Sequence, residues 1–148
     1  MIKSINDYIV GLKDIIDNNI SGYLTAHSET GYTLDEPTIY MYEKKTFENM
    51  PAMVILADEI TSYQRERKSD VLDADISIYI LVTENEAKLA KYAYLYESAV
   101  RECLYQHPDI NDISYIWQST DFGMNISVGS QLVKQIHMVF SAHHQETY

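Results

Sequence analysis

A chain of 148 residues with 46% hydrophobic content is long enough and apolar enough to fold as a single domain, which excludes wholesale disorder. Its formal net charge of -11 argues against binding of duplex DNA or RNA, because such affinity depends on basic side chains that neutralise phosphates. The longest apolar run, residues 52–57, is too short to cross a membrane, and the first residues lack the apolar segment of a signal peptide, so we expect a cytoplasmic protein without membrane contact.

The first predicted element is a helix over residues 4–20. Its apolar residues share one face at helical spacing, and Ser4 with Asp7 offers an N-terminal cap. Gly22 is interpreted as the stop signal. The polar residues 21–49 are predicted to form a loop, in which the alternating residues 39–42 are either a weak edge strand or a piece that orders only in an assembly.

A long antiparallel hairpin is predicted over residues 52–82. Its first strand begins with a run that is apolar on both faces, as in a central strand, and its second strand alternates apolar and polar residues from Leu72 to Val82. We expect Val54 and Ile55 to lie roughly opposite Ile78 and Ile80. The distal half is polar and is expected to protrude as an arm, because such an arm cannot bury itself in its own core.

A second amphipathic helix is predicted over residues 84–107. Thr83 and Glu86 have the spacing of a capping box, and Pro108 is expected to end the helix. A closing hairpin over residues 113–143 follows, with a turn at 121–123 and a polar, frayed C-terminus. The sequence thus predicts an α+β domain, with two main helices packed on a mixed or antiparallel sheet of four to five strands.

Residues capable of chemistry are few, and we expect no enzyme, cofactor or metal. The histidines His137, His143 and His144 are the one cluster; His137 and His143 share a strand face, whereas His144 points the other way. Asp73 and Asp75 lie about 7 Å apart on one strand face, a separation that suits an inverting glycosidase but also an ordinary solvated face. Cys103 falls on the inward side of its helix, as a small core residue does, and as the single cysteine it cannot form an intrachain disulfide.

Three groups of residues are interpreted as candidate binding surface. Three of the eleven basic residues are crowded into the hairpin turn, which favours a docking arm for an acidic neighbour. Tyrosine and arginine recur at helical spacing on the outward side of the second helix, and both types are enriched at interfaces. Together with a tyrosine on the outer face of the long strand, the candidates are Arg65, Arg67, Lys68, Tyr94, Arg101, Tyr105 and Tyr79.

The order of these segments resembles that of the tail terminator (tail completion) proteins of long-tailed bacteriophages. The best local matches are the Pro51-Ala52 start of the first core strand and the acidic-to-apolar strand from Leu72 to Val82. The resemblance extends over nearly the whole chain, except that residues 23–46 are longer and more polar than in a compact terminator.

This resemblance implies a structural virion protein of the tail or neck, assembled in the bacterial cytoplasm. Its copies would form a hexameric ring that caps the tail tube, stops tube polymerisation and meets the head connector. Three alternatives stay open: a head-completion or neck adaptor protein, a small hydrolase built around Asp73 and Asp75, and a monomeric regulatory module.

Overall fold

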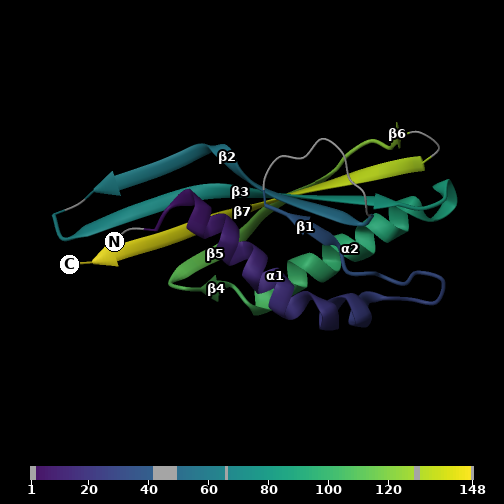
Figure 1. Cartoon of the computed structure of the whole chain (residues 1–148), viewed down its shortest axis with the longest axis horizontal. Coiled ribbons are helices and arrows are strands. Elements are labelled where there is room, and N and C mark those ends of the chain that lie inside the picture. The colour runs from purple at the N-terminus through teal and green to yellow at the C-terminus, as the bar shows by residue number, and fades with distance from the viewer. Residues whose placement is uncertain (1–2, 42–49, 66, 129–130, 148) are drawn as a thin grey trace.

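The computed structural model describes residues 3–41, 50–65, 67–128 and 131–147 (Figure 1). The elements follow in the order α1 (Ile5–His27), β1 (Thr38–Tyr40), β2 (Ala52–Arg65), β3 (Ser69–Thr83), α2 (Glu86–Gln106), β4 (Asp109–Ile110), β5 (Ile113–Phe122), β6 (Ile126–Val128) and β7 (Gln131–Thr147). Residue 42 of the predicted piece at 39–42, and residues 42–49 at the end of the predicted loop, lie outside the described residues.

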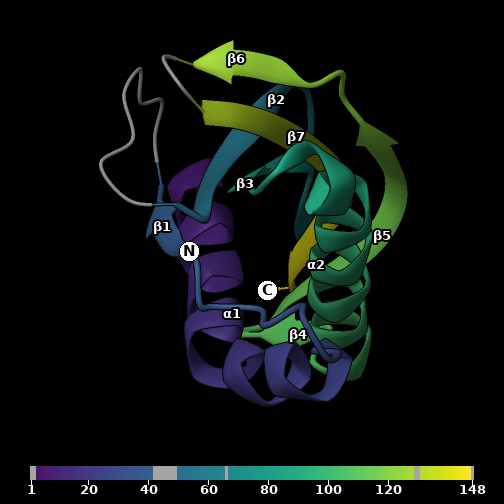
Figure 2. The same cartoon turned by 90° about the vertical axis from the view of Figure 1, so that its right-hand side faces the viewer.

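Seven strands of the described chain form one mixed sheet in the order β1-β2-β3-β7-β5-β4, with β6 paired to β7 beside this path. Only the β1–β2 pairing is parallel among the recorded pairs. Figure 2 shows the sheet curling around α1 and α2, which lie on its concave side. The predicted α+β class is confirmed, but four to five strands is too few: β1, β4 and β6 have only two or three residues, which is too short for a periodic pattern.

The alternation along β3 has the predicted physical basis. Ile76, Ile78 and Ile80 are fully buried on the face that meets the helices, and the residues between them lie on the outer face. In the hairpin, Val54 pairs with Tyr79 and Ile55 with Ile78, which agrees with the expected register to within one residue. The hairpin base is therefore apolar on both faces, with Ile55 and Ile78 toward the helices and Val54 beside Tyr79 on the outer face.

The hairpin is less isolated than the sequence suggests. The other side of β3 pairs with β7 along its full length, from Ser69 opposite Thr147 to Thr83 opposite Val133. The expected two-stranded arm is thus a three-stranded extension, and only its turn stands beyond the sheet (Figure 1). The expectation of a frayed C-terminus is wrong for the same reason, because β7 continues to Thr147 and its backbone is paired there.

Two predicted helix boundaries need correction, although the start of α1 is confirmed by a complete capping box between Ser4 and Asp7. The helix does not stop before Gly22 but continues to His27, because burial of Leu24 in the core stabilises one more turn. At α2 the N-cap is Asn85.

Thr83 is not a cap because it stays in β3, where its hydroxyl donates to the carbonyl of Leu132. A local capping pattern was overridden by pairing with a distant strand.

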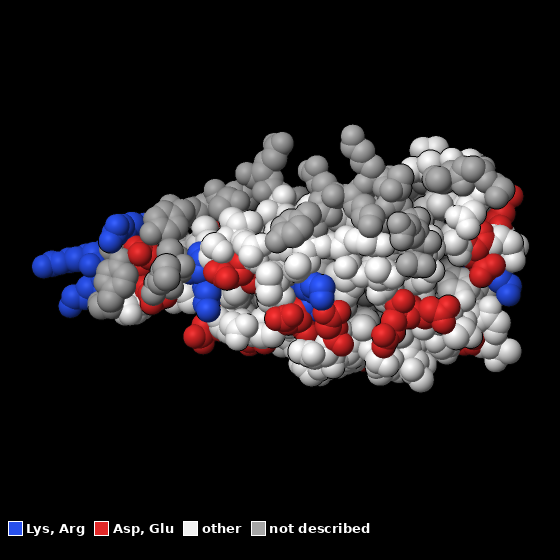
Figure 3. All heavy atoms as spheres, viewed as in Figure 1, with Lys and Arg blue, Asp and Glu red and all other residues white. Residues whose placement is uncertain are grey.

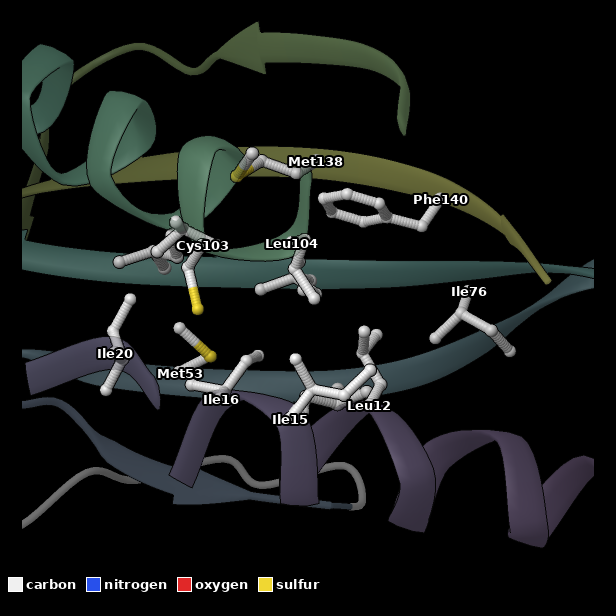
Figure 4. Packing of buried hydrophobic residues seen from close by; sticks show 14 of the residues in the cluster. Leu12, Ile15, Ile16, Ile20, Met53, Ile76, Cys103, Leu104, Met138 and Phe140 are labelled. Carbon is white, nitrogen blue, oxygen red and sulfur yellow. The ribbon is translucent and has the colours of Figure 1, made fainter. Parts of the chain in front are cut away.

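The core lies between the helices and the concave face of the sheet. Figure 4 shows Leu12 and Ile16 of α1 pointing toward Met53 and Ile76 of the sheet, with side chains of α2 between them and Met138. Burial of these apolar side chains is the main stabilising term of the fold. The helices are therefore held on one face of the sheet, and their outward sides stay available for other contacts.

Candidate functional site

The exposed large hydrophobic side chains of the described residues all come from one part of the chain, α2 to β6. They are Tyr94, Tyr105, Ile116, Trp117, Phe122, Met124 and Ile126. Tyr105 is 80% exposed and Ile116 is 62% exposed, although both are apolar enough to belong in a core. Contiguous exposed apolar surface of this kind marks interaction sites in soluble proteins.

Five of these residues belong to the seam where α2 lies beside β5, and we call this surface the α2–β5 face: Tyr94, Tyr105, Ile116, Trp117 and Phe122. Trp117 and Phe122 pair with Phe140 and Ile136 and lie on the side of β5 toward α2, whereas Ile116 pairs with Ser141 and lies on the other side of the same strand, at the border of the groove. The ring of Tyr94 meets Phe122 edge-on, with 5.0 Å between the ring centroids. The same face thus carries two of the residues expected from the sequence, Tyr94 and Tyr105, together with three aromatic or aliphatic residues of β5 that were not expected.

A groove of about 920 Å³ opens at the C-terminal half of α2 on this face. Buried Leu104, Tyr115 and Phe140 form its apolar base. Its polar lining includes Glu102, which is paired with His27 of α1. The groove is therefore mainly apolar with charged groups at its border, the composition of a surface that binds another macromolecule.

A hydrogen-bonded chain connects the helix to the strand beside this groove. The nearly buried carboxylate of Glu97 accepts from the Arg101 guanidinium at 2.7 Å and from the Thr120 hydroxyl at 3.1 Å. The indole N–H of Trp117 donates to the same hydroxyl at 2.9 Å. Arg101 also lies over the Trp117 ring, 5.4 Å from its centroid. Arg101, expected as an interface residue, thus lies at this face, in contact with both Glu97 and Trp117.

A bulge in β5 makes this arrangement possible. The pairing with β7 shifts register between Trp117 and Ser119, so one residue, Gln118, is left over. Trp117 and Thr120 then both lie on the face that α2 covers, where strict alternation would have put them on opposite faces. The bulge is a tertiary feature, and the local signal for it is weak.

The other expected residues lie elsewhere. Arg65, Arg67 and Lys68 are exposed at the turn between β2 and β3, which we call the arm tip, and Figure 3 shows basic side chains gathered there. Arg65 lies 3.5 Å from Asp70 of the same turn. Tyr79 is half-buried on the outer face of the sheet, where it stacks on His137 with 4.3 Å between ring centroids. The structure thus places the candidates in three separate regions and does not bring them together.

The residues considered for chemistry also lie apart. Asp73 is bound to His143 on the outer face of the sheet, at 2.5 Å, whereas buried His144 donates to the carbonyl of Asp112. No three side chains of metal-binding type come together within the described part of the chain. None of the helices described there has both the length and the hydropathy to span a bilayer.

Cys103 should be unreactive in the folded protein. Burial raises the pKa of its thiol to about 11, so the thiolate needed for reaction is scarce at neutral pH. We expect a disulfide reagent to modify Cys103 at pH 7 only after unfolding, as measured by the thiol titre with and without denaturant. Rapid modification of the native protein would contradict the buried position.

The same shift has a pH consequence. The pKa of the Cys103 thiol is above its ordinary value of 9 in the folded protein. The stability that the buried neutral thiol contributes is therefore complete below pH 9 and is lost as the pH rises toward 11. Buried tyrosines whose pKa is also raised act in the same direction. The loss of unfolding free energy between about pH 8 and about pH 10.5 should therefore be smaller in Cys103→Ala than in the wild type.

Comparison of the sequence with protein-family models and with curated proteins finds no match.

Proposed function

We propose that this protein is a structural subunit of a bacteriophage tail, a tail terminator whose copies form a hexameric ring that caps the tail tube and joins it to the head connector. The observation that carries the proposal is the concentration of exposed large hydrophobic residues on the α2–β5 face. A free surface of that kind is unfavourable in water and becomes favourable once another subunit covers it.

Two further observations support a ring. The arm tip and the α2–β5 face lie toward opposite lateral edges of the sheet, since β3 and β7 separate β2 from β5 in the strand order. A subunit that binds its neighbour through two different surfaces forms a head-to-tail contact, which gives a ring when the rotation between neighbours closes and an open filament when it does not. The resemblance of the sequence's segment order to tail terminators is the second support.

The test is the mass of the purified protein by light scattering, alone and with assembled tail tubes, followed by negative-stain imaging. We expect six times the chain mass of 17.1 kDa, or a cap at one end of each tube. A protein that stays monomeric and leaves tubes uncapped would overturn the proposal. Binding to isolated head connectors without binding to tubes would place it in the neck instead.

A further inference from the structure

The sheet has two incompletely covered edges. On one side, β1 pairs with β2 only at residues 52–54, and no other described strand pairs with the outer edge of β2 from 55 to 65. On the opposite side, β4 pairs with β5 only at residues 113–114, and the amide of Tyr115 donates to the carbonyl of Pro108. Within the described residues, no strand pairs with that edge from 116 to 122. Long unpaired edges are templates for strand addition.

The two edges have compatible directions. β2 is antiparallel to β3, β3 to β7, and β7 to β5, so β2 and β5 run in opposite directions in one subunit. If the sheet of one copy continues into the next, β2 of the first therefore lies antiparallel to β5 of the second. The short covering strands do not prevent this, because β1 covers the start of β2 and β4 covers the start of β5, which are opposite ends of the pair.

Charge favours the same alignment. Antiparallel pairing brings the end of β2, which carries Arg65, to the start of β5, beside the turn that carries Asp112. The basic arm tip then lies against the turn between β4 and β5, where Asp109 and Asp112 are exposed. In a chain of net charge -11, this is a specific match of a basic with an acidic group.

We propose that neighbouring copies join by strand addition, with the β2 edge of one copy pairing antiparallel to the β5 edge of the next and the arm tip docking on Asp109 and Asp112. This proposal rests on the proposed ring and names its contact. The added strand covers Ile116 and Trp117 at the groove. It also satisfies the backbone groups of β5, as a peptide does when it extends a sheet edge.

Reversing the charges of the arm tip and, separately, removing or reversing those of Asp109 and Asp112 tests this contact. The tip variant carries Arg65→Glu, Arg67→Glu and Lys68→Glu, and the acid variant carries Asp109→Lys and Asp112→Asn. Asparagine is used at 112 because the backbone there has φ of 64°, a conformation that asparagine tolerates. We expect each variant to associate at least about tenfold more weakly than the wild type, because complementary charges become like charges. The chain with all five substitutions should recover most of that loss.

Hydrogen exchange supplies the second readout, since strand addition must protect backbone amides of residues 116–122 on assembly. Thermal unfolding of each monomer checks that the variants fold. Rings that form with neither a charge effect nor amide protection would overturn strand addition and leave the proposed function standing. A wild-type protein that never assembles, alone or on tubes, would overturn both.

Discussion

Replacing Ile116 by aspartate is expected to weaken self-association by about 30-fold or more, the effect of losing about 2 kcal/mol at an interface centre. Ile116 is 62% exposed in the single subunit and borders the groove, so the folded monomer should lose little stability. In the proposed ring an added strand would cover residue 116, and the desolvation of a carboxylate placed there is costly. Sedimentation velocity across a concentration series measures the change.

Met124→Asp is the matched control. Met124 is 88% exposed, carries a side chain of similar volume and lies between β5 and β6, away from the residues that line the groove. The charge change is the same, so this variant should assemble nearly as well as the wild type. An equal loss in both variants would assign the effect to net charge, and an unchanged Ile116→Asp ring would remove the groove from the interface.

Substituting alanine at Gly11 is expected to destabilise the protein by about 1–3 kcal/mol, because overpacking and a displaced hydrogen bond both act there. A Cβ at Gly11 would lie 2.7 Å from the hydroxyl oxygen of Tyr115, which is buried and donates to the carbonyl of Tyr8. α1 approaches β5 this closely only because residue 11 has no side chain. Urea unfolding measures the change in free energy, and the loss should be smaller in a Tyr115→Phe background.

Gly22→Ala is the control in the same helix, and the opposite sign is expected. No atom lies within 4 Å of a Cβ built at Gly22, so alanine meets no obstacle. It should stabilise α1 by about 0.5–1 kcal/mol, since glycine in a helix interior loses more backbone entropy on folding. Equal effects at both positions would mean that helix propensity, and not the contact with Tyr115, dominates at Gly11.

The elements that the sequence predicted correctly are those with long periodic patterns. β3 alternates over many residues, and α2 repeats apolar residues at helical spacing, so each reports its own buried face. The end of α1, the cap of α2 and the length of β7 were wrong because they depend on distant partners. Leu24 packs into the core, Thr83 bonds to Leu132, and the end of β7 pairs with the start of β3.

By itself the sequence determined an α+β domain with one apolar face on each main element, and it indicated the basic arm tip and the outward Tyr94, Arg101 and Tyr105 of α2. Only the tertiary structure placed Trp117 beside Arg101, put Ile116 at the border of the same groove and left one edge of β5 open among the described residues. The physical reason is that periodicity reports whether a face is buried, whereas the neighbour across it is chosen by pairing between remote strands. The bulge at Gln118, which turns Trp117 and Thr120 toward Glu97 together, arises from that pairing.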